Sequence, residues 1–195
     1  KDQVEVWQFD RNSYRKIDQL ATPDGPRRAL IKDLTGDGKG ELILFDSTNL
    51  NIYSWTGEKF EQQWWQGPVG GEIVNLYVGD ADLDGLKELV ILRKRVQEED
   101  TAKFINTIEI WQYNGSSFIK KMKTSEFPFY NLLVEQIKPN QAANIIGIGK
   151  SGLAGFIWNG QVYVERFGSP VIKGQVTVGD VDGNGFQNLI CLDEL

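Results

Sequence analysis

Three short segments of the sequence crowd acidic side chains between two apolar runs. In the middle segment Asp80, Asp82 and Asp84 alternate along the chain, Gly85 follows them, and Glu88 stands four residues after the last aspartate. The flanking apolar runs are typical of β-strands, so the carboxylates must share one tight connection. Because crowded carboxylates repel one another unless a cation joins them, the segment predicts a metal site.

Calcium is the cation that fits this pattern. It takes about six to eight oxygen ligands, and a loop with oxygens at positions 1, 3 and 5, a glycine at 6 and a later acid can supply them. An EF-hand would also need an acid at position 12 and flanking helices. Position 12 is Leu44, Ile91 or Cys191 in the three segments, each inside an apolar run. The pattern therefore predicts calcium loops between strands, and the alternative is an Asp-Gly turn without metal.

The loop pattern recurs along the chain at a spacing that indicates an internal repeat. The copies begin at residues 33, 80, 136 and 180, which are 47, 56 and 44 residues apart. The copy at 136 keeps the spacing and the apolar strand but has lost the acids. A repeat of this length is typical of a β-propeller blade.

A hairpin with paired aromatic residues alternates with each loop. Alternating apolar residues indicate strands, and the TG and NG dipeptides indicate tight turns. The paired aromatics occupy equivalent places and are Trp7 and Phe9, Tyr53 and Trp55, Trp111 and Tyr113, and Phe156 and Trp158. We expect them to pack between neighbouring repeats, and the alternative is a platform for a ligand.

Each repeat thus has four antiparallel strands, and the sequence predicts an all-β fold. We expect a single β-propeller domain over residues 1–195 with four four-stranded blades. The units cover approximately 29–66, 74–123, 131–168, and 172–195 together with 1–20. The last unit would pair the N-terminal and C-terminal hairpins and close the ring, which removes free sheet edges. The alternatives are a fragment of a larger propeller or half of a dimeric one.

The loops, the strands after them and the aromatic hairpins resemble the FG-GAP or VCBS-type repeats of integrin α-chain propellers and of many bacterial surface proteins. The resemblance covers nearly the whole chain. In that family the acidic loop lies within the blade and binds calcium for structure, which implies two or three calcium ions here. Carried over by position, the metal ligands are Asp33, Thr35, Asp37 and Glu41; Asp80, Asp82, Asp84 and Glu88; and Asp180, Asp182, Asn184 and Asn188.

The three loops differ in their acids, and the expected calcium affinity follows this difference. Thr35 replaces an acid in the first loop, and Asn184 and Asn188 replace two in the third. We therefore expect the second loop to bind calcium most tightly and the third most weakly. In the copy at 136, Lys138 stands at a ligand position and would supply its own positive charge, so we expect no ion there.

Connections between the repeats carry the candidate partner-binding residues. Each connection contains a proline, which stiffens it. Their residues of the types that anchor interfaces are Arg27, Arg28, Trp64, Trp65, Phe129 and Tyr130. They predict a protein-interaction module or a subunit of an extracellular or surface assembly. The alternative is a calcium-dependent, lectin-like carbohydrate-binding module in which Trp64 or Trp65 stacks on a sugar, but a lectin built from repeats would carry such a pair in several blades.

Composition narrows the function classes further. The chain has no histidine, no nucleophile elbow and no phosphate-binding glycine loop, so we expect no enzyme. Its formal net charge of -6 argues against a nucleic-acid partner. No apolar run approaches the roughly 20 residues that span a bilayer, so we expect no membrane insertion. Calcium loops of moderate affinity suit the millimolar calcium outside cells, so we expect a secreted, periplasmic or cell-surface location.

Overall fold

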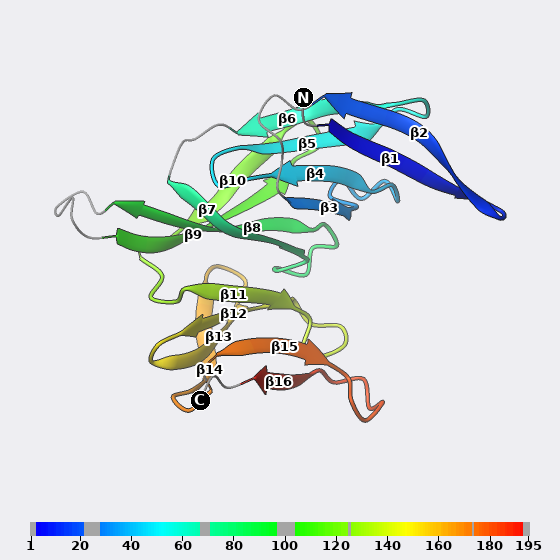
Figure 1. Cartoon of the computed structure of the whole chain (residues 1–195). Helices are drawn as coiled ribbons and strands as arrows, with labels where there is room; N and C mark the ends of the chain where they lie inside the picture. Colours follow the sequence, from blue (N-terminus) through cyan, green and yellow to red (C-terminus); the bar gives the residue numbers. More distant parts are fainter. Residues whose placement is uncertain are drawn as a thin grey trace.

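The structure is a computed structural model that describes residues 3–21, 28–66, 71–96, 104–124, 126–172 and 174–192. All regular secondary structure in these ranges is β-strand, arranged in five antiparallel sheets (Figure 1). The prediction of an all-β fold is therefore confirmed. No helix that could cross a membrane occurs in the described ranges.

Three sheets have four strands each, and the strands follow one another in chain order. Sheet 1 joins β3 (Arg28–Lys32), β4 (Glu41–Phe45), β5 (Leu50–Trp55) and β6 (Phe60–Gln66); sheet 2 joins β7 (Glu72–Gly79), β8 (Glu88–Val96), β9 (Phe104–Tyr113) and β10 (Phe118–Lys123); sheet 3 joins β11 (Asn131–Glu135), β12 (Asn144–Gly149), β13 (Gly152–Trp158) and β14 (Tyr163–Ser169). Each sheet thus contains one copy of the loop between its first two strands, acidic in sheets 1 and 2 and without the acids in sheet 3, and one aromatic hairpin formed by its last two strands. This is the strand order that the repeat pattern predicts.

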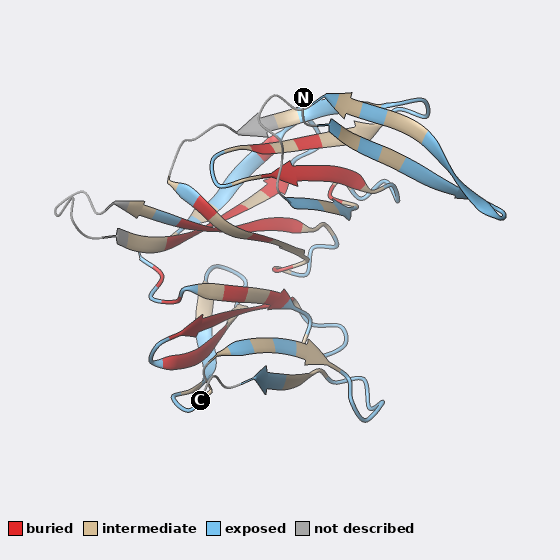
Figure 2. Cartoon of the chain, viewed as in Figure 1, coloured by how far each residue is buried: buried red, intermediate tan, exposed pale blue. Residues whose placement is uncertain are grey.

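Apolar clusters lie between successive sheets and hold them together. Sheets 1 and 2 share a cluster that includes Ile43, Ile52 and Leu89. A second cluster joins sheets 2 and 3 and includes Leu92 and Leu132. All residues of β4 and of β12 are buried, so these strands are covered on both faces (Figure 2). Continuous apolar runs, rather than alternating ones, follow from this double burial.

Two further hairpins flank the three sheets. The N-terminal hairpin joins β1 (Gln3–Asp10) to β2 (Ser13–Ala21), and the C-terminal hairpin joins β15 (Gln175–Gly179) to β16 (Asn188–Leu192). They form separate two-stranded sheets at opposite ends of the stack (Figure 1). The predicted pairing of these hairpins into a fourth blade, and with it the closed four-bladed ring, is not confirmed.

Acidic loops and hairpin turns share one side of the molecule. Because consecutive antiparallel strands reverse direction, the connections β3–β4 and β5–β6 of sheet 1 emerge at the same end, and the other sheets repeat this arrangement (Figure 1). The second acidic loop, between β7 and β8, therefore lies beside the turn of its own hairpin β9–β10. Side chains from both can meet there.

Candidate metal site

The second acidic loop brings three carboxylates together. Oxygens of Asp80, Asp82 and Glu88 lie within 4.8 Å of one another. Glu88 begins β8 and is 0% exposed, although it carries an ionisable group. Its Oε2 accepts a hydrogen bond of 2.7 Å from the backbone N–H of Ala81. That bond fixes the glutamate under the loop, with its carboxylate beside those of the two aspartates.

All three acidic loops share a backbone scaffold built on these side chains. The residue at position 9 accepts the N–H of position 2 in each loop, at 2.7 Å for Glu41, 2.7 Å for Glu88 and 3.1 Å for Asn188. The aspartate at position 1 accepts the N–H of position 6, at 3.0, 3.1 and 2.8 Å for Asp33, Asp80 and Asp180. This scaffold needs no metal, so it explains the loop shape but not the number of acids.

Position 4 separates the second loop from the other two. In the first and third loops a glycine at this position, Gly36 or Gly183, donates its N–H to the Oδ1 atom of the position-1 aspartate at 2.8 Å. The second loop has Leu83 there, in the left-handed region at φ 63°. A left-handed conformation is costly for a residue with a branched side chain and is typical of functional loops.

Two carboxylate oxygens of the second loop are left without hydrogen-bond partners. Among the described residues, Asp80 Oδ1 and Asp82 Oδ1 are buried and accept no hydrogen bond. A buried acceptor without a donor costs about 1–3 kcal/mol, and more when it carries a charge. Both aspartates belong to the three-carboxylate group. A cation that prefers oxygen ligands, such as calcium, would bind both oxygens at once, whereas a turn without metal leaves both without a partner.

Side chains from other strands complete the surroundings of the second loop. The Nε2 atom of Gln112, on β9, donates to Asp84 Oδ2 at 2.6 Å and to Glu88 Oε1 at 2.7 Å. Lys121, on β10, pairs with Asp82 and lies 3.9 Å from Asp84. Asp84 therefore faces Gln112 and Lys121 rather than the three-carboxylate group.

Tyr163 extends the site across the boundary between sheets. This residue lies on β14 of sheet 3, and its hydroxyl donates to the carbonyl oxygen of Ala81 at 3.2 Å. Burial raises its pKa, and the nearby carboxylates, Glu88 foremost, raise it further. The tyrosine thus stays protonated and ties sheet 3 to the second loop.

Burial also acts on Glu88. Desolvation by burial, together with the smaller effect of the charges of Asp82 and Asp84, raises the pKa of the carboxyl to about 7, although the hydrogen bond from Ala81 and the charge of Lys121 lower it. Such a site holds a proton at a pH at which free glutamates have lost theirs. A divalent cation would release that proton.

The first and third loops keep the spacing but differ in burial. Glu41 of the first loop is buried, which raises the pKa of its carboxyl, with smaller contributions from Asp37 and Asp33. In the third loop, Asp180 and Asp182 are exposed. Hydrogen bonds from the N–H groups of the loop, that of Gly185 first, hold the pKa of Asp180 below its usual value. That calcium binds at any of the twelve predicted ligands stays a prediction.

The six predicted partner-binding residues are scattered. Arg27 and the side chain of Trp65 lie outside the described residues. Trp64 packs between Trp111 and Phe118, with ring centroids 5.2 and 5.3 Å away, and Phe129 is buried against Phe127 and Phe156. Tyr130 is 45% exposed. A ligand-binding role for these residues stays a prediction, and the structure brings none of the described ones together with the acidic loop.

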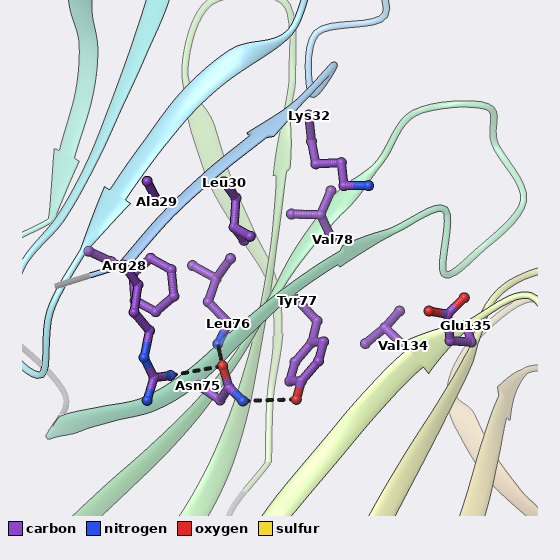
Figure 3. Close-up of a pocket in the computed structure, with 11 residues that line it drawn as sticks. Arg28, Ala29, Leu30, Lys32, Asn75, Leu76, Tyr77, Val78, Val134 and Glu135 are labelled. Carbon is purple, nitrogen blue, oxygen red and sulfur yellow. Dashed lines mark hydrogen bonds between the residues drawn. The ribbon is translucent and has the colours of Figure 1, made fainter. Parts of the chain in front are cut away.

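Arg28 lines a cavity of about 490 Å³ between the first strands of the three sheets (Figure 3). Its Nη1 atom donates to Asn75 Oδ1 at 3.0 Å, and its guanidinium lies 5.7 Å from the ring centroid of Phe45. Asn75 in turn donates to the hydroxyl of Tyr77 at 2.8 Å. The cavity thus has a fixed polar wall on β7.

Sequence reasoning missed three residues of the site. Gln112, Lys121 and Tyr163 come from later strands, and no local pattern connects them with the loop. Leu83 did carry a signal, because the second loop reads DADLDG where the first reads DLTGDG.

The sheets and the loop geometry define a β-propeller-type repeat fold with a loop of the same spacing between the first two strands of each repeat, which is acidic in sheets 1 and 2 and not in sheet 3. Residues 33–91 match the model of the FG-GAP-like repeat, so the resemblance to FG-GAP repeats that the sequence indicates is confirmed. The matched stretch contains the first and second acidic loops.

Among solved structures, the chain resembles part of the Tc holotoxin pore of Photorhabdus luminescens. The TM-score is 0.51 and the sequence identity 17%, over 84% of this chain. This chain spans only 8% of that one, and at this identity the likeness concerns the fold alone. No curated protein matches the chain in sequence.

Proposed function

We propose that this chain is a non-catalytic, calcium-binding propeller-type module that binds another protein, in a secreted, periplasmic or cell-surface setting. The observation that carries the calcium part is the pair of buried, unpartnered oxygens, Asp80 Oδ1 and Asp82 Oδ1, beside Glu88. The calcium would serve structure, since it ties the β7–β8 connection to the start of β8. Calcium binding accounts for these acidic side chains without a catalytic role.

The second loop is the first choice for an ion, and the first loop follows. The second loop contributes four acidic side chains against one lysine, Lys121, so its local charge favours a divalent cation. The first loop keeps a buried glutamate, Glu41, but its Asp33 is already satisfied by two backbone N–H groups. The third loop is exposed and carries two asparagines. We expect occupancy in the order second, first, third.

A protein partner fits the fold better than a sugar does. Interaction is a frequent use of propeller-type repeats, and the structural neighbour is part of a holotoxin. Trp64, which a lectin would need at its surface, packs against Trp111 and Phe118 instead. We therefore do not propose a carbohydrate ligand.

Thermal unfolding in calcium, magnesium and chelator tests the calcium proposal. A ligand at a hundred times its Kd stabilises the folded state by about 2.7 kcal/mol, which raises Tm by roughly 5–10 °C in a chain of this size. We expect this shift in the wild type, a smaller one with magnesium, and its loss in Asp82→Asn. The matched control is Asp182→Asn, the same position in the exposed third loop, which should keep the shift. An unchanged Tm in chelator would refute the structural role of calcium.

A further inference from the structure

The first strands of the three complete sheets carry a polar residue at one equivalent position. Arg28 on β3, Asn75 on β7 and Asn131 on β11 each stand four residues before the last residue of their strand. In both asparagines the Oδ1 atom accepts the N–H of the next residue, at 2.9 Å in each case. The repeat therefore sets these three side chains at the same level around the cavity between the first strands.

Hydrogen bonds join these side chains into a polar chain, which consists of Arg28, Asn75, Tyr77 and Asn131. Arg28 Nη1 donates to Asn75 Oδ1 at 3.0 Å, and Asn75 Nδ2 donates to the hydroxyl of Tyr77 at 2.8 Å (Figure 3). The hydroxyl of Tyr77 donates in turn to Asn131 Oδ1 at 3.4 Å. The polar chain thus crosses all three sheets and holds its side chains in one orientation.

A β-bulge in β7 helps to position Arg28. The register between β7 and β8 shifts between Ile73 and Asn75, so Val74 has no partner on β8. The carbonyl oxygen of Val74 accepts a second hydrogen bond from Arg28 Nη1, at 3.0 Å. The pairs β3–β4 and β11–β12 show no such shift. The repeat therefore does not require the bulge, and bulges of this kind often re-aim groups beside a functional site.

The guanidinium of Arg28 keeps an unmatched charge and unused donors. Both acceptors of its Nη1 atom are neutral, and no carboxylate of the described residues binds Arg28. The opposite edge of the group, with Nε and Nη2, makes no hydrogen bond within the described ranges. This edge can bind a carboxylate through two parallel N–H bonds.

The acidic groups near Arg28 do not neutralise it. Asp46 lines a second cavity, of about 380 Å³, beside Arg28, and its carboxylate accepts the N–H groups of its own turn. Glu72 lines the same cavity and is exposed to solvent. Glu135 and Lys32 lie together at the other end of the first strands, about 13 Å away along the strand. The end of the cavity at Arg28 is therefore positive.

Apolar side chains form most of the remaining wall of the first cavity. They include Leu30, Leu76, Val78 and Val134. Its volume of about 490 Å³ lies in the range of about 300–1,000 Å³ that is typical of ligand sites. A single guanidinium on a chain of net charge -6 suits a ligand with one negative charge. The cavity thus fits one carboxylate on an apolar body.

We propose that Arg28 and this cavity bind a carboxylate of the partner protein, on an aspartate or glutamate that has an apolar neighbour. The inference rests on the proposed protein-binding role and names the chemistry that the partner presents. The carboxylate pairs with Nε and Nη2 of Arg28, and the apolar neighbour packs against the wall formed by β7 and β11. Because the polar chain already holds the guanidinium, less conformational entropy is lost on binding.

A titration with short peptides, followed by the nuclear magnetic resonance signal of the Arg28 Nε–H group, tests this proposal. The probe is acetyl-Leu-Glu-Leu-amide, and the matched probe is acetyl-Leu-Gln-Leu-amide, which has the same shape without the charge. We expect the glutamate peptide to shift the Arg28 signal and to bind about tenfold more tightly than the glutamine peptide, since charged bidentate bonds are the stronger ones. Hexanoate, a free acid with an apolar body, is the third probe.

Variants separate the fork of Arg28 from general charge. Arg28→Lys keeps the charge but loses the bidentate edge, and Asn75→Asp gives Arg28 a carboxylate within the protein. Each should weaken binding of the glutamate peptide about tenfold while circular dichroism shows an intact fold. The control Lys123→Gln removes one exposed positive charge from the outer strand β10 and should change the affinity by less than about twofold.

Three results would overturn the proposal. One is equal binding of the two peptides, or no shift of the Arg28 signal with either at millimolar concentration. Another is unchanged affinity in both Arg28→Lys and Asn75→Asp. The third is a shift with hexanoate but not with the glutamate peptide, which would make the cavity a site for a free acid rather than for a protein partner.

These outcomes are distinguishable from failure of the calcium proposal. A wild type that gains Tm from calcium and binds neither peptide would refute the carboxylate site and leave the calcium site standing. A wild type that binds the glutamate peptide through Arg28 but has the same Tm in chelator would do the opposite.

Discussion

The substitution Glu88→Gln should stabilise the protein without calcium and abolish its response to calcium. Glu88 is fully buried, and burial raises the pKa of its carboxyl from 4.5 to about 7. Glutamine has nearly the same shape and can still accept the N–H of Ala81. The substitution removes the negative charge that causes both effects, and it replaces one carboxylate oxygen with an amide donor, so Gln112, which donates to Glu88 Oε1, must reorient.

The sign and size of the change in the free energy of unfolding follow from proton linkage. The raised pKa means that the folded protein holds more protons than the unfolded chain between about pH 4.5 and 7, so the free energy of unfolding falls as pH rises through this window. The fall amounts to about 3 kcal/mol at most, since each pKa unit corresponds to about 1.4 kcal/mol. At pH 8 in chelator, Glu88→Gln should therefore be more stable than the wild type by about 1–3 kcal/mol. The gain falls below the full value because the reorientation of Gln112 costs free energy.

Urea unfolding at pH 5 and pH 8, with calcium or chelator, measures this directly. In chelator the wild type should lose stability between the two pH values and the variant should lose less. In calcium at pH 8 the wild type should overtake the variant. The control Glu72→Gln, exposed on β7, should follow the wild type throughout. A variant less stable than the wild type in chelator at pH 8 would refute the reasoning, since Glu88 would then be stabilised as a carboxylate by the protein alone.

Three further substitutions test the surroundings of the loop and of sheet 2. Lys121→Met removes a cation that competes with calcium for Asp82. Loss of an ion pair worth about 1 kcal/mol should make calcium binding about fivefold tighter by calorimetry. Weaker binding would mean that the lysine supports the site. Tyr163→Phe removes the hydrogen bond from the hydroxyl to the carbonyl oxygen of Ala81 and should lower the free energy of unfolding in urea by about 1 kcal/mol. An unchanged free energy of unfolding would mean that this bond does not stabilise the fold. Arg93→Met removes the 3.0 Å partner of the buried Glu109, which keeps Lys120 at 2.8 Å, and should cost about 1–3 kcal/mol in urea unfolding. No loss of stability would contradict a stabilising role for the Arg93–Glu109 pair.

Much of the fold could be predicted from the sequence because the repeat is regular. Apolar runs such as β4 and β8 follow the acidic loops at fixed spacing, and hairpin turns follow the aromatic residues at fixed spacing. These local patterns predict four strands per repeat without knowledge of contacts between distant segments. The pattern also suggested that the N-terminal and C-terminal hairpins pair into a fourth blade, and this is not confirmed, because β1–β2 and β15–β16 form separate two-stranded sheets.

The candidate site could be predicted only in part. The carboxylates are neighbours in the chain and were visible as a pattern. Two side chains that contact these carboxylates, Gln112 and Lys121, lie 28 residues after Asp84 and 39 residues after Asp82, and they reach the loop only through strand pairing. The sequence predicts Trp64 as a candidate partner-binding residue. Its place between two aromatic rings of sheet 2 depends on packing between sheets, which the sequence pattern does not specify.

Native mass spectrometry in calcium tests the central claim most directly, because it counts bound ions on the intact chain. We expect the wild type to carry calcium and Asp82→Asn to carry one ion fewer per chain, while Asp182→Asn keeps the tightest ion. Equal ion counts in the wild type and Asp82→Asn, or a wild type that binds no calcium, would contradict a calcium site in the second acidic loop.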